Sequence, residues 1–251
     1  MVDEVKELEC FCWTHPVIGK GRHCRSCPIG GGPRRVHDSV RDEVYNMYRS
    51  AGLVARTEVK DMLPDNGDIP GDIVVEGMPN TGNGLVIDVT VTDSRTITEG
   101  DSLVSLQRRA STVGVEARER EEFKRNKKGG VGNERMQDRV RAIGYRFCPI
   151  AFEVDGAVGD TWSRNLKQLS EIAHERRGSN RASFRTKWTA RLGICLAKEG
   201  AKYAVRHANR LVSRHKGSNA AFEDRDVDPV FEPGVHDVIV MGDPSWDSKY
   251  I

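Results

Sequence analysis

The chain has 251 residues, of which 37% are hydrophobic and 30% are charged. This length and composition allow one large domain with a smaller appendage, and they exclude a fibrous or repetitive protein. No stretch approaches the roughly 20 consecutive apolar residues that a membrane-spanning helix needs, so a transmembrane protein is excluded. The acidic N-terminus lacks an apolar run, and we therefore expect a protein that is not secreted.

The formal net charge of +2 conceals three segments of different sign. Residues 1–162 carry a net −3, and residues 163–216 carry a net +11 from 14 basic and 3 acidic side chains. Residues 217–251, with 2 basic and 8 acidic side chains, form an acidic tail of net −6. A strongly basic segment between acidic neighbours is a candidate surface for a polyanion.

Cysteine and histidine are concentrated near the N-terminus. Without a secretory signal, such a cluster indicates a metal site rather than disulfides. A four-coordinate structural zinc ion would find five good ligands there, Cys10, Cys12, His23, Cys24 and Cys27. The spacing does not choose between His23 and Cys24, and we expect a zinc-binding module over residues 1–34. The other two cysteines, Cys148 and Cys195, lie in apolar surroundings and are expected to be buried thiols.

Hydrophobic periodicity predicts the elements that follow. Helical spacing predicts a helix over 37–51, and three strands are expected over 53–59, 72–76 and 85–92. A long polar helix over 102–128, the end of another helix over 139–143 and a buried strand over 145–154 come next. This order predicts an α/β core in which the last strand pairs beside a three-strand meander. The basic segment 163–216 is expected to be helical.

Two carboxylates fall on neighbouring strands of this core. Asp72 opens the second predicted strand, and Asp88 lies within the third, where an unpartnered charge among β-branched residues is costly. On adjacent antiparallel strands the two can face one another, an arrangement that favours a cation between them. Mg²⁺ is commonly held by one or two carboxylates plus phosphate oxygens, and a metal ion so held can activate water for attack on phosphorus.

The same chemistry needs a positive group beside the phosphate. In metal-dependent nucleases this group is usually a lysine two residues after the second carboxylate, and this sequence has Thr90 there. The nearest replacements are Lys124 and Lys127, which share one face of the predicted polar helix. The spacing leaves open which of the two lysines acts.

These features resemble the PD-(D/E)xK, or restriction-endonuclease-like, superfamily. GDI at 71–73 and IDVTVTD at 87–93 are similar to its core, and more narrowly to the restriction-like endonuclease domain of site-specific non-LTR retrotransposons. The resemblance covers about two hundred residues in order: the Cys/His module, RRVHDSVRD at 34–42, EAREREEFKRN at 116–126, YRFCPIAFEVDGAVG at 145–159 and the basic helices near 185–214. Asp38 stands where that group's Arg-His-Asn helix start has Asn, and Gly71 replaces the residue before the first aspartate.

The resemblance implies a DNA endonuclease that depends on Mg²⁺ or Mn²⁺, with a restriction-endonuclease-like core over 35–162. Asp72 and Asp88 would bind the catalytic metal, and Lys124 best matches the family's lysine, with Lys127 next. Glu43 and Glu58 are candidates to complete the metal site, and the alternative is that both face solvent. The zinc ligands implied are Cys10, Cys12, His23 and Cys27, with Cys24 as the alternative.

Since no reverse transcriptase accompanies the domain in this sequence, we expect a free-standing, site-specific nuclease of a mobile element, such as a homing endonuclease. It would act inside the cell, in a compartment that contains DNA. Cleavage of both strands needs two active sites, so symmetry favours a homodimer. The alternatives are a junction resolvase or RNA endonuclease of the same fold, and a zinc-containing nucleic-acid-binding protein without catalysis.

The basic segment is expected to contact double-stranded DNA. Acidic partners four residues away from its cations are nearly absent, so phosphates are the simplest compensation for their charge. From Lys198 onward they recur every four residues. The full set is Arg185, Lys187, Arg191, Lys198, Lys202, Arg206, Arg210 and Arg214.

Removing zinc is expected to unfold the first 35 residues, because a segment this rich in glycine and proline has no hydrophobic core of its own. Limited proteolysis with and without a chelator measures this. Unchanged protease resistance of the segment after chelation would argue against a structural zinc site.

Overall fold

The computed structural model describes residues 31–63, 69–93, 112–129 and 133–215, with the backbone alone over 211–215. The expected zinc ligands and the acidic tail 217–251 lie outside these ranges. Within them the chain is a mixed α/β protein with five helices and a four-strand mixed sheet. No helix in the described ranges is both long and apolar enough to cross a membrane.

The predicted order of helix, three strands, helix and strand is confirmed within the described ranges. The elements are α1 (Gly32–Ser50), β1 (Val54–Thr57), β2 (Ile73–Glu76), β3 (Gly84–Thr92), α3 (Val115–Asn126), β4 (Lys128–Gly129), β5 (Glu134–Arg135), α4 (Met136–Ala142), β6 (Tyr145–Glu153), α5 (Asp160–Arg177) and α6 (Arg181–His215). The helix expected over 102–128 is described only from residue 112, and its helical part is α3. The short hairpin of β4 and β5 was not expected.

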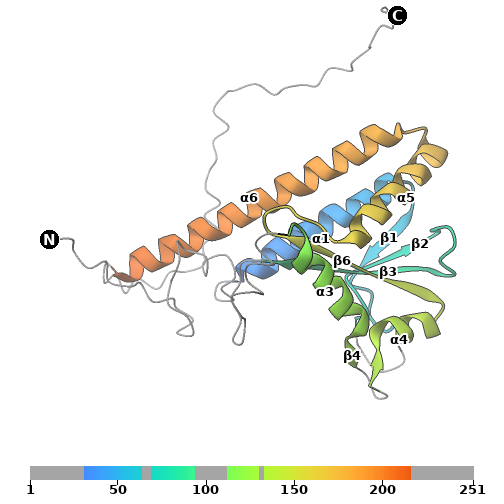
Figure 1. Cartoon of the computed structure of the whole chain (residues 1–251), viewed down its shortest axis with the longest axis horizontal. Coiled ribbons are helices and arrows are strands. Elements are labelled where there is room, and N and C mark those ends of the chain that lie inside the picture. The colour runs from blue at the N-terminus through green and yellow to red at the C-terminus, as the bar shows by residue number, and fades with distance from the viewer. Residues whose placement is uncertain (1–30, 64–68, 94–111, 130–132, 216–251) are drawn as a thin grey trace, which may run out of the picture.

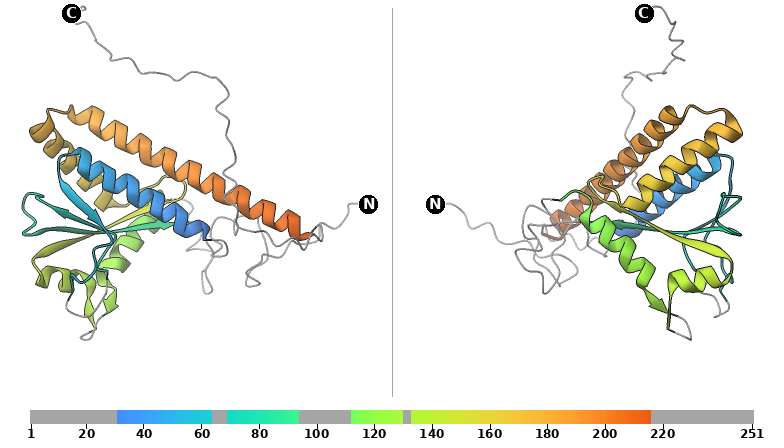
Figure 2. Two further views of the ribbon diagram at one scale, coloured as in Figure 1. Left: turned by 180° about the vertical axis from the view of Figure 1, so that it is seen from behind. Right: turned by 45° about the vertical axis from the view of Figure 1, so that its right-hand side comes forward.

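The sheet has the strand order β1-β2-β3-β6. Strands β1, β2 and β3 pair antiparallel, and β6 pairs parallel to β3, which confirms that the last strand joins the meander. A parallel pair needs a crossover connection, and the segment with α3 and α4 provides it. Helices α1, α5 and α6 cover one face of the sheet, and α3 and α4 cover the other (Figures 1 and 2).

Alternation along β3 assigns its side chains to the two faces. Leu85, Ile87 and Val89 join the larger core beneath α1, α5 and α6, and Val86 joins a smaller core with Val140 of α4. Asp88 has the same parity as Val86 and therefore faces the side of α3 and α4. A carboxylate on this buried face must find its partners on the crossover helices.

Helix α6 runs antiparallel to α1 and shares its core. Arg191 donates two hydrogen bonds to the Glu43 carboxylate, at 2.8 and 2.9 Å, and its guanidinium lies 4.9 Å from the ring centre of buried Trp188. Tyr203 packs so closely on Gly32 that a side chain there would overlap its ring. The boundary expected at residue 162 therefore marks a change of charge, while the packing continues across it.

The two isolated cysteines differ in exposure. Cys148 is buried as expected, Cys195 is only partly buried, and both are free thiols. Burial raises the pKa of each to about 11, so neither is a reactive thiolate near neutral pH.

Buried Glu121 joins α3 to the start of α5. Its carboxylate accepts hydrogen bonds from the Thr161 hydroxyl at 2.7 Å and from the Thr161 amide at 3.1 Å. An acid at this position accepts a hydrogen bond from a free amide in the first turn of α5, and its negative charge interacts favourably with the positive end of the helix dipole. Because Lys124 follows Glu121 by three residues on α3, this contact also sets where Lys124 lies.

Substituting Gly159→Ala is expected to lower the free energy of unfolding by about 1–3 kcal/mol, the cost of disturbing buried hydrogen bonds. A Cβ atom at Gly159 would lie 2.1 Å from Oε1 of Glu121, so the carboxylate would have to leave Thr161. Urea unfolding measures the change. Gly193→Ala is the matched control, because the space around Gly193 in α6 is open and alanine should stabilise the helix by about 0.5–1 kcal/mol. Equal stability of the two variants would contradict the role of Glu121.

Candidate active site

Asp72 and Asp88 occupy opposite positions at the end of the β2–β3 pairing. Ile73 pairs with Ile87, so the next position along the same register places Asp72 across from Asp88. Asp72 was predicted to open the second strand, but β2 begins one residue later, so Asp72 lies just before β2 while Asp88 lies within β3. This register therefore puts the two aspartates at facing positions of neighbouring strands.

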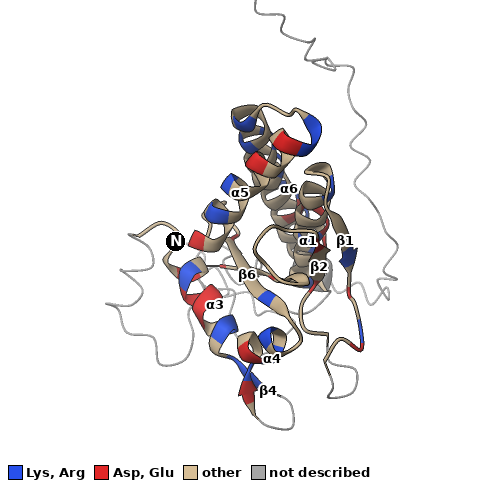
Figure 3. Ribbon diagram, turned by 90° about the vertical axis from the view of Figure 1, so that its right-hand side faces the viewer, with Lys and Arg blue, Asp and Glu red and all other residues tan. Residues whose placement is uncertain are grey.

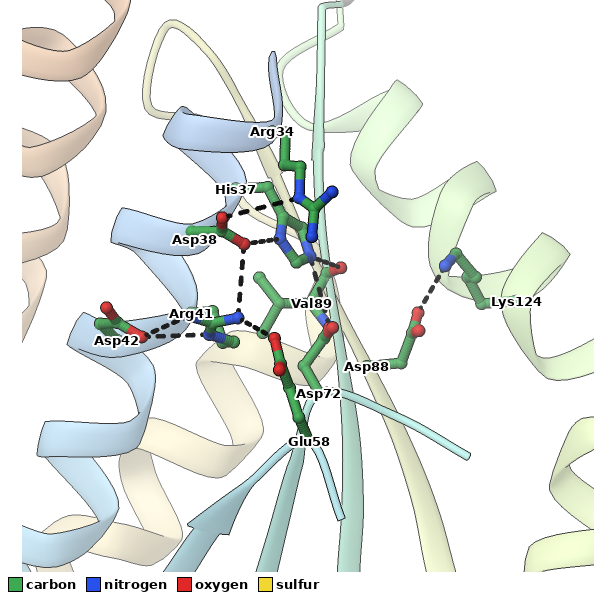
Figure 4. Close-up of polar contacts among 10 residues, drawn as sticks. All are labelled: Arg34, His37, Asp38, Arg41, Asp42, Glu58, Asp72, Asp88, Val89 and Lys124. Atoms are coloured by element: carbon green, nitrogen blue, oxygen red, sulfur yellow. Dashed lines mark hydrogen bonds and ion pairs between the residues drawn. The ribbon is translucent and has the colours of Figure 1, made fainter. Parts of the chain in front are cut away.

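Lys124 reaches this pair from α3. Its Nζ atom lies 2.8 Å from Oδ2 of Asp88 (Figure 4). Burial raises the pKa of Asp88, a shift that Lys124 opposes and that the charge of Asp72 adds to. Lys127, at the end of α3, is exposed and makes no ion pair with either carboxylate. The structure thus brings one of the two candidate lysines to the site.

His37 on α1 reaches the other carboxylate, and sequence reasoning gave it no role. Its Nε2 atom lies 3.1 Å from the Val89 carbonyl and 3.4 Å from Oδ2 of Asp72, and its Nδ1 atom lies 3.2 Å from Oδ1 of Asp38. The hydrogen bond with Asp72 does most to raise the pKa of His37, to about 9. The signal in the sequence was the similarity of residues 34–42 to an Arg-His-Asn helix start, in which His37 stands at the histidine.

The backbone of Val89 in β3 contacts both Asp72 and His37. Strand β2 ends before it reaches Val89, so the backbone groups of Val89 have no partner on β2. The Val89 amide donates a 2.6 Å hydrogen bond to Oδ2 of Asp72, and the Val89 carbonyl lies beside His37. Side chains therefore satisfy the backbone groups that a longer β2 would have paired. The same contacts hold Asp72 in a fixed orientation beside β3.

Close packing accounts for glycine before Asp72. A Cβ atom at Gly71 would lie 2.7 Å from the Ile87 carbonyl oxygen and 2.8 Å from Cγ1 of Val86. One of these contacts involves the backbone of β3, which cannot rotate away. A larger residue at position 71 would therefore push Asp72 away from Asp88.

The carboxylates of the two further candidates for the metal site are paired with arginines. Glu58 makes a 2.6 Å ion pair with Arg41, which also contacts Asp38 and Asp42 (Figure 4). Glu43 is bound to Arg191 of α6. Neither of these two carboxylate groups contacts the side chain of Asp72 or Asp88 in the described part of the chain. The backbone amide of Glu58 donates a 2.9 Å hydrogen bond to the Asp72 carbonyl, so Glu58 supports Asp72 through its main chain while its carboxylate binds Arg41.

The donor set fits a magnesium ion held by two carboxylates. The assigned contacts of Asp72 and Asp88 all use Oδ2, which leaves Oδ1 of each without a partner among the described residues. These residues contain no group of three or more acidic, histidine or cysteine side chains that could enclose a metal. Mg²⁺ does not require such a cage, because it commonly takes one or two carboxylates and fills its other positions with water and substrate phosphates.

The eight basic residues expected to bind DNA do not form one face. A step of four residues turns an α-helix by about 40° more than one full turn, so the row from Lys198 to Arg214 winds around α6. Lys198 is exposed, whereas Lys202 makes a 3.0 Å ion pair with Glu199. Arg206 and Arg210 are partly buried, and the side chain of Arg214 lies outside the described part.

The upstream basic residues lie farther from the carboxylates. Arg185 and Lys187 are exposed near the turn between α5 and α6, a region that also shows basic residues in Figure 3. Arg191 is bound to Glu43. Because α6 runs antiparallel to α1, Lys198 lies at about the level of His37 and Arg185 near the opposite end of α1.

In the metal-free protein, His37 is expected to titrate with a pKa of about 9, and Asp72→Asn should lower it toward 6.5. Because the folded-state pKa lies above the unfolded value, the stabilisation from protonated His37 is complete below about pH 6.5 and is lost as the pH rises through 9. NMR titration in EDTA measures the pKa. Urea unfolding at pH 6 and pH 9.5, compared with His37→Gln, measures the stability. A native pKa near 6.5 would contradict the contact with Asp72.

No family model matches the chain, and no curated protein was found to be similar to it.

Proposed function

We propose that the protein is a metal-dependent DNA endonuclease of the restriction-endonuclease-like kind. One observation carries the proposal: Lys124 of α3 lies 2.8 Å from Asp88, which stands opposite Asp72. Two carboxylates can hold Mg²⁺ and a lysine can stabilise the charge that develops on the phosphate, so these three groups suit phosphodiester hydrolysis. Here the lysine comes from a helix, and β3 has Thr90 at the usual position. The four-strand mixed sheet with helices on both faces is compatible with this assignment.

In this mechanism, Asp72 and Asp88 would hold Mg²⁺ or Mn²⁺. The bound ion would activate water and offset the negative charge of the phosphate. Lys124 donates a hydrogen bond to the phosphate oxygen on which charge develops, and His37 keeps Asp72 in place. The water oxygen bonds to phosphorus as the bond to the leaving oxygen breaks. The water proton is released to solvent, and the leaving oxygen takes up a proton from solvent.

The finer parts of the proposal concern target and assembly. Site-specific cleavage of double-stranded DNA as part of a mobile element, a homodimer with two active sites and a zinc module that uses Cys10, Cys12, His23 and Cys27 all rest on the resemblance described above. A binding protein without catalysis is the alternative. The Asp88–Lys124 contact favours the enzyme, because a buried acid in a lost site would gain stability from an apolar replacement.

The native protein is expected to cleave a mixed genomic DNA pool in Mg²⁺ or Mn²⁺, with the new ends located by sequencing. Asp88→Asn and Lys124→Ala should each lower the rate at least 100-fold, because they remove a metal ligand and a group that stabilises developing charge. Lys127→Ala is the matched control, and its rate should stay within about twofold of native because that side chain is exposed and away from Asp88.

The outcomes of this assay are distinct. Ends that gather at one site and vanish in Asp88→Asn support a site-specific endonuclease. Scattered ends that also depend on Asp88 indicate a junction-directed or relaxed nuclease. Tight DNA binding by the native protein without any cleavage would overturn the enzymatic proposal in favour of a binding protein.

Lys198→Ala is expected to reduce the salt dependence of DNA binding by about 0.9 log unit per log unit of salt, because it removes one phosphate contact at the level of the active site. Arg185→Ala, at the far end of α6, should leave the slope unchanged. Fluorescence anisotropy in EDTA at several salt concentrations measures both. An equal reduction of the salt dependence in the two variants would show that DNA contacts both ends of α6, which contradicts the placement of DNA near Lys198.

A further inference from the structure

Thr90 has a buried hydroxyl group without a partner. Its Oγ1 atom is buried and accepts or donates no hydrogen bond within the described part of the chain. Thr90 follows Asp88 by two residues on β3, so both side chains face α3. The unpartnered hydroxyl therefore lies on the same face as the Asp88–Lys124 pair.

The residues around Thr90 account for this lack of a partner. On the same face of β3, Asp88 forms an ion pair with Lys124, although its buried Oδ2 atom, like Oγ1 of Thr90, lacks a well-aligned hydrogen bond. The Thr92 hydroxyl lies 3.3 Å from Glu116. The neighbours on β6 are Pro149 beside Asp88 and Ala151 beside Thr90. A proline ring and a methyl group offer no hydrogen bond, and the Ala151 amide is directed to Glu121 at 3.4 Å.

A buried hydroxyl without any hydrogen bond is unfavourable, and nearly all such groups in proteins have a protein or water partner. Valine would fill the same space without that cost. The group that pairs with Thr90 must therefore come from outside the described protein atoms. Beside a carboxylate and an ammonium group, a water molecule is the partner of the right size and polarity.

We propose that Thr90 is a positioning residue whose hydroxyl holds the attacking water beside Asp88 and Lys124. This inference rests on the proposed nuclease function. Thr90 occupies the position where metal-dependent nucleases usually have their lysine, and here Lys124 brings its ammonium group from α3 to the same carboxylate. The hydroxyl accepts a hydrogen bond from the water, so that an oxygen lone pair remains free to attack phosphorus.

Turnover by two Thr90 variants tests the proposal. Thr90→Val should lower kcat about tenfold or more, because the attacking water would no longer be oriented, while DNA affinity stays unchanged. Stability should be equal or higher, because the substitution removes no hydrogen bond within the protein. Thr90→Ser should retain most of kcat. Thr92→Val is the matched control, since it makes the same change two residues along β3 and should keep native turnover. Native kcat in Thr90→Val would overturn the proposal.

A crystal structure of the native protein at high resolution supplies a test that does not need activity. We expect a water within hydrogen-bonding distance of Oγ1 of Thr90 and also of Lys124 or Asp88, and its absence in Thr90→Val. A Thr90 hydroxyl bonded to a protein carbonyl, or density without water, would overturn the proposal. If the native protein shows the water but cleaves no nucleic acid, the nuclease function fails while the water site stands.

Discussion

The repulsion between two opposed carboxylates is the constraint on which this structure depends. Asp72 and Asp88 meet where β2 and β3 stop pairing, and Asp88 is largely buried. Two like charges at such a place are costly unless positive groups approach them. Lys124 approaches from one face of the sheet and His37 from the other, so each carboxylate has its own cation. A metal ion between the two would reduce the same repulsion.

The rest of the fold holds these two cations in position. Glu121 joins α3 to the start of α5 and so sets the position of Lys124. Helix α1, which carries His37, packs against α6, and the Glu43–Arg191 ion pair joins the two helices. The contacts of Arg41 with Glu58, Asp38 and Asp42 hold the start of the meander beside the same helix. Glu43 and Glu58, which were candidates for metal binding, thus pair with arginines and help to hold α1 in place.

Particular residues show why some of this was predictable and some was not. The run of β-branched residues around Asp88 predicted a buried strand, and the helical spacing from Val40 to Tyr48 predicted α1, because both patterns are local. The role of His37 was not predictable from spacing, since its partners lie 35 and 52 residues away in the sequence. The four-residue spacing of the basic residues on α6 does not place them on one face, because a four-residue repeat winds around a helix that turns every 3.6 residues.

The sequence by itself determined the α/β class, the order of the elements and the two aspartates on adjacent strands, because these follow from periodicity within short windows. Only the tertiary structure decided that Lys124 rather than Lys127 meets Asp88, that Glu43 and Glu58 bind arginines, and that Thr90 keeps an unpartnered hydroxyl. These outcomes depend on how far α3 rotates against the sheet and how α6 lies on α1. Such orientations are set by packing between distant segments, which no local pattern records.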